Sequence, residues 1–217
     1  MSETLNLLLV STWQTIYMVA VSVLIATVFG IPLGILLMVT DRGQILQNIL
    51  LNKILGTIVN IFRSVPFIIL LIVLIPFTRL LVGKAIGTTA AIVPLSVAAI
   101  PFMGRLTETA LREVNRGVIE AAQAMGASPF QIITRVLIPE ALPSIAAGIT
   151  ITTINLVGYS AMAGVIGGGG LGDLAVRYGY QRFMLDIMLY TVVILVVMVQ
   201  LTQMIGDFFV SRLSKNR

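Results

Sequence analysis

The sequence predicts an all-α, polytopic membrane protein with five transmembrane helices. Hydrophobic residues make up 58% of its 217 residues and charged residues only 11%, whereas a soluble domain has about 25% charged residues. The apolar residues also form long runs, and about 20 such residues in a row span the roughly 30 Å hydrocarbon core of a bilayer. A chain this short lacks the polar surface to cover several such runs, so we expect one transmembrane domain over residues 1–217.

Five apolar runs are expected to cross the membrane, at about residues 16–39, 54–77, 86–106, 142–166 and 184–210. A signal peptide starts with a positive region, and no Lys or Arg precedes position 42, so we interpret the first run as a retained helix. Proline and glycine interrupt the first three runs, where they either kink the helices or let neighbouring helices approach closely. These residues are Gly30, Pro32, Gly34, Pro66, Pro76, Pro94 and Pro101.

The distribution of Lys and Arg predicts the orientation. The loops after the first and third runs and the C-terminus hold nine, namely Arg42, Lys53, Arg105, Arg112, Arg116, Arg135, Arg212, Lys215 and Arg217. The N-terminus and the loops after the second and fourth runs hold four, namely Arg79, Lys84, Arg177 and Arg182. Cytoplasmic loops carry the excess. We therefore expect an external N-terminus and a cytoplasmic C-terminus in the inner (plasma) membrane of a bacterium.

The composition excludes most enzyme chemistry. The chain has neither Cys nor His, which removes disulfides, thiol nucleophiles, imidazole bases and the usual zinc ligands. No two carboxylates form an obvious acid–base pair, so we expect no catalytic residue and no metal site. The basic residues are spread among loops, which argues against nucleic-acid binding.

Two glycine patterns bear on nucleotide binding. Residues 167–172 match G-x-G-x-x-G, but a dinucleotide site needs this string between a strand and a helix. Here it follows a membrane run, so we expect an external turn. No G-x-x-x-x-G-K-[ST] string is present, so any ATP that drives this system must bind to another chain.

The segment at about residues 108–139 is predicted to form a cytoplasmic helical hairpin. Its first helix ends at Gly126, where a left-handed conformation favours glycine, and Ser128 with Pro129 begins a second helix. Glu120 lies four residues after Arg116, close enough to pair. The apolar positions are Val118, Ala121, Ala122 and Met125 on one face of the first helix, and Phe130, Ile133 and Leu137 on the second. The hairpin either lies on the membrane surface or docks a partner protein.

Part of this hairpin resembles the EAA motif of ABC importer permeases. The family pattern is E-A-A, three residues, G, nine residues, then I-x-L-P, and this chain has Val136 and Ile138 where the family prefers Ile and Leu. In that family the segment is a coupling helix that sits in a groove of the ATP-binding subunit. The resemblance therefore implies a docking surface for a separate ATPase subunit, made of Glu120, Ala121, Ala122, Gly126, Ala127 and Pro139.

Two further stretches narrow the resemblance. Residues 60–67 look like the start of the second helix in amino-acid permeases of this superfamily, and residues 156–162 with 169–172 resemble its methionine-uptake branch. The resemblance implies the type I ABC importer permease fold, a second copy of the chain and two ATP-binding subunits that hold ATP and magnesium. It also implies an external methionine-binding protein. The alternative is a permease for another amino acid.

The fourth run supplies candidates for the pathway. Because an amino acid is zwitterionic and the methionine side chain is apolar, a weakly charged passage suits it. Tyr159, Ser160 and Met162 are candidates for its lining or gate, with helix packing as the alternative. Arg63 lies inside the second run, where it faces a cavity or, if that helix begins near Ser64, snorkels to the interface.

Two other classes of membrane protein are less well supported. An ion-driven secondary transporter usually carries internal repeats and intramembrane carboxylates, and the sequence shows neither. A membrane-embedded enzyme would need an acid–base or metal set.

Overall fold

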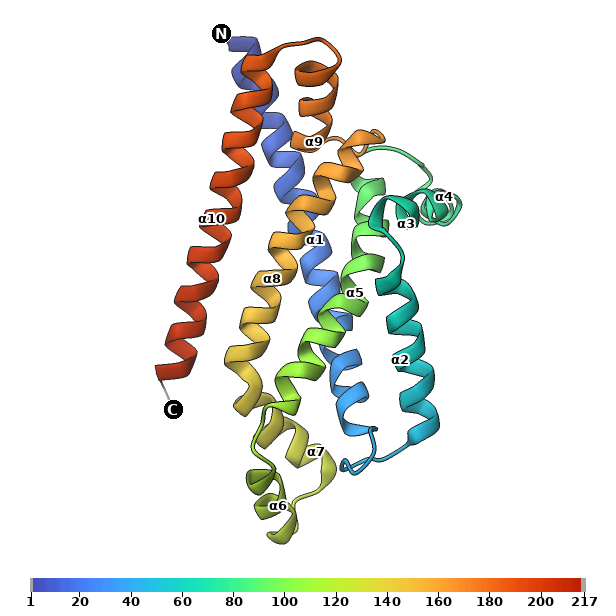
Figure 1. Ribbon diagram of the computed structural model, residues 1–217, viewed down its shortest axis with the longest axis vertical. Helices are drawn as coiled ribbons and strands as arrows, with labels where there is room; N and C mark the ends of the chain where they lie inside the picture. The colour runs from blue at the N-terminus through green and yellow to red at the C-terminus, as the bar shows by residue number, and fades with distance from the viewer. Residues whose placement is uncertain (1, 216–217) are drawn as a thin grey trace.

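Four long helices dominate the computed structural model, which describes residues 2–215. They are α1 (Ser2–Val39), α5 (Thr88–Arg112), α8 (Ile138–Val165) and α10 (Leu185–Lys215), and they pack along the long axis of the molecule (Figure 1). All four are long and apolar enough to cross a membrane, and a bent pair of shorter helices gives a fifth crossing if it counts as one span. The described residues form helices and no strand, so the all-α prediction is confirmed.

Shorter elements complete the chain. The N-terminus and α9 lie at one end of the molecule, whereas α6 and α7 lie at the other, toward which α10 also runs (Figure 1). This arrangement fits an odd number of crossings, although the side of the membrane on which each end lies stays a prediction. Arg217, at the end of the expected cytoplasmic tail, lies outside the described residues. The shorter elements are α2 (Ile49–Ser64), α3 (Phe67–Val73), α4 (Ile75–Val82), α6 (Arg116–Ala124), α7 (Pro129–Ile132), the π-helix η1 (Ile133–Leu137), α9 (Gly170–Leu174) and the π-helix η2 (Ala175–Tyr180).

The second expected span, residues 54–77, is not one helix. It begins earlier, at Ile49, where the Asn48 side chain accepts a hydrogen bond from the amide of Leu51 at 3.1 Å. It breaks after Ser64, and α3 leaves at an angle of 103° to α2. The cause is Pro66, because a residue before proline avoids the helical region, and Val65 is extended with φ −83° and ψ 125°.

Glycines in α1 serve helix packing. A Cβ added at Gly34 would lie 2.4 Å from the carbonyl oxygen of Gly104 in α5, and one at Gly30 would lie 2.8 Å from Cβ of Met103. The two helices therefore approach as closely as small residues permit. Helix α1 continues through Pro32, and α5 continues through its two prolines, Pro94 and Pro101. For α1 and α5, the interpretation of these residues as packing residues therefore holds. Breaks in the helix occur only in the second span.

The core lies where α1, α5 and α8 meet. Met18, Leu95, Met103 and Leu156 are fully or almost fully buried there. By contrast, the outer side of α10 exposes a long series of apolar side chains, among them Leu189, Val193, Leu201 and Phe209. A helix that is apolar around most of its surface suits a lipid environment.

Candidate functional site

The turn of the hairpin between α6 and α7 is fixed by glycine, as the sequence predicts. Helix α6 begins at Asn115, whose side chain accepts a hydrogen bond from the amide of Gly117 at 2.8 Å. At its other end, Gly126 has φ +79°. Its amide donates to the carbonyl of Gln123 at 2.9 Å, and the amide of Ala127 donates to that of Ala122 at 3.0 Å. This pair of bonds is a Schellman motif, in which glycine supplies the left-handed residue.

The second helix also begins where expected but does not form a separate element. The Ser128 and Gln131 side chains form a reciprocal capping box, with Pro129 at the first helical turn. Helix α7 then passes through η1 into α8 without a break, so the expected short second helix is wrong. Pro139 explains the π-turn before it, because proline lacks the amide needed for an α-helical bond and its ring crowds the preceding turn. The hairpin is therefore joined rigidly to the fourth span.

The hairpin has a buried side and an exposed side. Ile119, Ala122 and Ile132 are buried against the core. Met125 and Phe130 are 82% and 74% exposed. The apolar faces predicted for the two hairpin helices are therefore only partly correct. Ala122 turns inward, away from Val118, Ala121 and Met125, and Leu137 is buried while Phe130 is exposed.

The six predicted docking residues divide in the same way. Glu120, Ala121, Gly126 and Pro139 are exposed and Ala127 is half-buried, whereas Ala122 is buried. Glu120 and Arg116 both line a hollow beside the loop at residues 43–45. Within the described residues they form no ion pair, so the expected pairing is absent from this conformation. What remains exposed is an apolar and small-residue surface that the rest of the chain does not cover.

A network of charges that the sequence analysis did not predict lies directly above the hairpin. Glu108 belongs to α5, not to the hairpin as expected, and is only 3% exposed. Its carboxylate accepts hydrogen bonds from Arg105 at 2.6 Å and from Arg112 at 2.8 and 3.2 Å. Arg105 also donates to Asn60 of α2 at 2.8 Å, and Arg112 donates to Asp41 after α1 at 2.6 Å. The i, i+3 and i, i+4 spacing of these residues on one helix was the available signal.

This network ties three elements together. Hydrogen bonds from Arg112 and from the Arg42 amide hold the pKa of the Asp41 carboxyl below its ordinary value. The Asp41–Arg112 pair is therefore complete above the ordinary carboxyl pKa and is lost as pH falls through the lowered value. The hydrogen bonds of this network therefore connect α2, the first part of the broken second span, to α5 and to the end of α1.

The three candidates for the pathway lie on different sides of α8. The Tyr159 ring is half-buried and stacks on Phe67 of α3, with centroids 4.5 Å apart and planes at 3°. Ser160 is buried, and its hydroxyl donates to the carbonyl of Val157 at 2.7 Å, which supports the packing interpretation for this residue. Met162 is 46% exposed. The structure therefore does not bring these side chains together.

Arg63 occupies the last turn of α2. The interpretation in which the second helix begins near Ser64 is wrong, because α2 runs from Ile49 to Ser64. In Figure 1, α2 rises from the hairpin end and stops near mid-height of the molecule. Arg63 therefore lies in the last turn of α2, at the end of that helix away from the hairpin, and its side chain is exposed in the single chain.

The glycine-rich stretch forms a tight turn, as expected. Gly167 and Gly169 have positive φ angles, and α9 begins at Gly170. The amide of Gly170 donates to Gln14 at 2.8 Å, and that of Leu171 donates to Thr15 at 2.9 Å. These amides, which a nucleotide phosphate would need, are thus occupied by side chains of α1.

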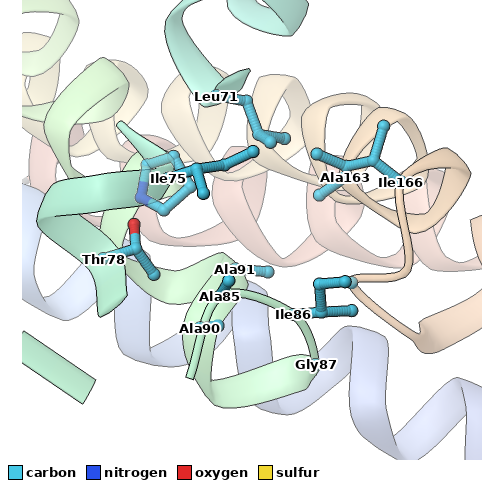
Figure 2. A pocket seen from close by; sticks show the side chains of 12 residues that line it. Leu71, Ile75, Thr78, Ala85, Ile86, Gly87, Ala90, Ala91, Ala163 and Ile166 are labelled. Atoms are coloured by element: carbon cyan, nitrogen blue, oxygen red, sulfur yellow. The ribbon is translucent and has the colours of Figure 1, made fainter. Parts of the chain in front are cut away.

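A small cavity lies beside this turn. Figure 2 shows it between α3, α4, the start of α5 and the end of α8, with Leu71, Ile75, Ala91 and Ile166 pointing into it. Its volume is about 20 Å³, which is room for roughly one water molecule. It cannot hold an amino acid, so we assign it to packing.

The chain matches the family of binding-protein-dependent transport system inner membrane components over residues 30–216. The matched region includes the hairpin, the broken second span and the last three long helices. The chain belongs to this family. As a member of the binding-protein-dependent transport family, it is a multi-pass permease component of the inner membrane, and the prediction made from the EAA motif is confirmed at this level.

Several relatives in the family carry more specific names. The chain is 57% identical over 207 residues to the probable D-methionine transport system permease protein MetI of Vibrio cholerae, which covers 95% of this chain and 92% of the relative. It is 55% identical over 165 residues to the D-methionine transport system permease protein MetI of Escherichia coli, with 76% of each chain covered.

Solved structures show the same permease fold. A chain from the inward-facing conformations of the MetNI methionine ABC transporter matches with a TM-score of 0.97 and 49% identity, over 98% of this chain and 99% of that one. A chain from an amino acid ABC transporter crystallised with histidines matches with a TM-score of 0.80 over 97% of this chain. Because the identity there is 19%, this second match shows the fold alone. The prediction of the type I importer permease fold is confirmed.

Proposed function

We propose that this chain is the membrane-spanning subunit of an ATP-driven importer that carries methionine, in its L form and in its D form, into the cytoplasm. The observation that carries the proposal is the 57% identity, over nearly the whole chain, to a permease named for D-methionine transport. The match to a chain of the MetNI methionine ABC transporter supports it. The chain does no covalent chemistry, and transport proceeds by alternating exposure of a pathway to the two sides.

The α6–α7 hairpin is proposed to dock the ATP-binding subunit. Glu120, Ala121, Gly126 and the exposed side chains of Met125 and Phe130 form a surface that the rest of the chain leaves uncovered. An exposed apolar patch of this kind typically marks a protein contact. Because α7 runs continuously into α8, a push on the hairpin would reach the fourth span without a flexible joint.

The assembly is proposed to contain two copies of this chain, two ATP-binding subunits that hold ATP and magnesium, and an external methionine-binding protein that delivers substrate. The exposed apolar sides of the long helices face lipid or the second copy. The N-terminus is external and the C-terminus cytoplasmic, since the hairpin must lie on the side where ATP is available. Tyr159 and Met162 are retained as candidates for the pathway, and Ser160 is assigned to packing because its hydroxyl bonds within α8.

Uptake in cells tests the substrate. In a methionine auxotroph that lacks other methionine importers, deletion of this chain should abolish high-affinity uptake of labelled methionine, and a plasmid copy should restore it. Unchanged uptake would rule out methionine and favour another amino acid.

Site-directed cross-linking tests the docking surface. The chain has no cysteine, so Met125→Cys creates a single attachment point for a thiol-reactive photo-cross-linker. Irradiation should join this position to the ATP-binding subunit. Tyr180→Cys is a matched control, because Tyr180 is 70% exposed and ends η2, which directly follows α9 at the opposite end of the molecule (Figure 1). Equal adducts from both positions, or none from position 125, would favour a hairpin that lies on the membrane surface.

A further inference from the structure

The break in the second span creates a pocket. It lies where the end of α2, the extended residue Val65 and the start of α3 meet α5 and α8, and its volume is about 170 Å³. Arg63, Phe67, Phe102 and Tyr159 are among the residues that line it. Unlike the 20 Å³ cavity in Figure 2, this pocket has room for a small organic molecule and includes a charged group.

The charge in this pocket has no partner in the part of the chain that the structure describes. The ion pairs there involve Arg105, Arg112 and Arg177, and the guanidinium of Arg63 makes neither an ion pair nor a hydrogen bond. The Arg63 side chain is exposed in the single chain, and a cation of a membrane domain usually faces the bundle interior or a water-filled cavity, where it pairs with another group. The nearby Asn60 amide oxygen, one turn earlier in α2, is already bonded to Arg105.

Aromatic side chains form much of the rest of the pocket. Phe67 and Tyr159 stack face to face at 4.5 Å, which brings α3 and α8 together and gives the pocket a flat apolar wall. Phe102 of α5 also lines it. A thioether makes favourable contacts with aromatic rings, worth about 0.3–1.5 kcal/mol each. The pocket thus offers one cationic group beside an apolar, polarizable surface.

We propose that this pocket is a transient binding site for the amino-acid substrate on its way through the permease. The Arg63 guanidinium binds the α-carboxylate through paired hydrogen bonds, and the apolar side chain rests against Phe67, Tyr159 and Phe102. The inference rests on the proposed function for its substrate. It goes beyond that function in assigning Arg63 as a specificity-determining residue for α-amino acids with a free carboxylate.

Photo-cross-linking tests this assignment. The purified complex of this chain with its ATP-binding subunit is irradiated in lipid with photo-methionine, without the external binding protein. Mass spectrometry should locate the label in residues 62–70 or beside Tyr159 of this chain. Excess methionine should compete, whereas methioninol, which lacks the carboxylate, should not. Arg63→Gln should lower the labelling by about tenfold or more, as expected for the loss of charge-assisted hydrogen bonds to the carboxylate.

Two variants serve as controls. Arg63→Lys keeps the charge but not the planar fork, so its labelling should fall between wild type and Arg63→Gln. Arg79→Gln removes an exposed arginine of α4 that does not line the pocket, and it should label like the wild type. Unaltered labelling in Arg63→Gln, or competition by methioninol equal to that of methionine, would overturn the assignment.

Uptake by the wild-type complex separates this inference from the proposed function. If that complex imports methionine while the label lies elsewhere or ignores Arg63, the pocket assignment alone fails. If the complex imports no methionine, the proposed substrate fails, and with it the assignment for methionine. In the first case Arg63 is a structural residue that pairs with a lipid phosphate or with the second copy.

Discussion

Gly126 and Glu108 are the residues whose local chemistry most directly shapes the hairpin end of this permease. Gly126 turns the chain between α6 and α7 with φ +79°, and a Cβ there would meet open space. The turn therefore requires glycine for its backbone conformation and not for lack of room inside the chain. Glu108 is a buried carboxylate held between two guanidinium groups. Glu108 lies near the end of α5, and Gly126 belongs to the surface proposed to meet the ATPase.

Replacing Gly126 separates the demands of the turn from those of the docking surface. Gly126→Leu forces a side chain into a left-handed conformation, at a cost of roughly 1–2 kcal/mol, and it should lower the yield of the complex with the ATP-binding subunit and the uptake rate. Gly126→Asn tolerates this conformation but still places a side chain on the surface. If Gly126→Asn assembles normally, the defect of Gly126→Leu comes from the backbone conformation. If Gly126→Asn also fails to assemble, the defect comes from a side chain that blocks close contact with the partner. Normal assembly and uptake in Gly126→Leu would contradict the docking proposal.

Removing the charge of Glu108 should destabilise the base of the bundle. Glu108→Gln leaves Arg105 and Arg112 with one weaker acceptor, and hydrogen bonds to charged groups contribute about 1.5–3 kcal/mol. The midpoint of thermal unfolding in detergent should therefore fall. Asp207→Asn is the control, because Asp207 is an exposed carboxylate on α10. Equal midpoints for wild type and Glu108→Gln would show that the network is too well solvated to stabilise the fold.

At the scale of whole elements, the broken second span and the close contact of α1 with α5 set the architecture. Seven proline and glycine residues were noted in the first three spans, yet helices break only beside Pro66 and Pro76, both in the second span. The sequence cannot rank them, because proline removes the same backbone bond wherever it stands. Gly34 instead packs closely against Gly104 of α5, and such a contact between distant residues is visible only after folding.

The α1–α5 contact can be tested by filling it. A Cβ at Gly34 would lie 2.4 Å from a backbone oxygen of Gly104, so Gly34→Leu should destabilise the protein by about 1–3 kcal/mol or more through overpacking. Gly56→Ala is the matched control, since nothing lies within 4 Å of a Cβ there and alanine favours a helix by about 1 kcal/mol over glycine. The readout is the fraction of folded, monodisperse protein after mild heating. Comparable fractions for the two variants would disprove the close packing of these helices.

The hairpin shows which features were predictable at this scale. Gly126 and the Ser128–Pro129 start follow from local turn chemistry and were predicted correctly. The exposure of Phe130 and the burial of Leu137 were not, because η1 shifts the helical phase between them. The break before α3 also builds the Arg63 pocket, whose members come from three distant parts of the sequence.

For the molecule as a whole, the distribution of charge predicts the direction of insertion. Reporter fusions at Thr4 and after Arg217 should label opposite sides of the membrane, with the N-terminus external, because nine of the counted Lys and Arg residues lie on the hairpin side and four on the other. The measurement is paired alkaline phosphatase and fluorescent protein activity in intact cells. Signals on the same side would contradict five crossings.

The central claim is that this chain forms the passage of an ATP-driven methionine importer. The most direct measurement is uptake of labelled methionine into proteoliposomes that contain this chain with its ATP-binding subunit and the external methionine-binding protein. We predict uptake that requires hydrolysable ATP on the hairpin side and that stops when the ATP-binding subunit is omitted. Uptake driven by an ion gradient without ATP, or no uptake of methionine while ATP is hydrolysed, would contradict the account.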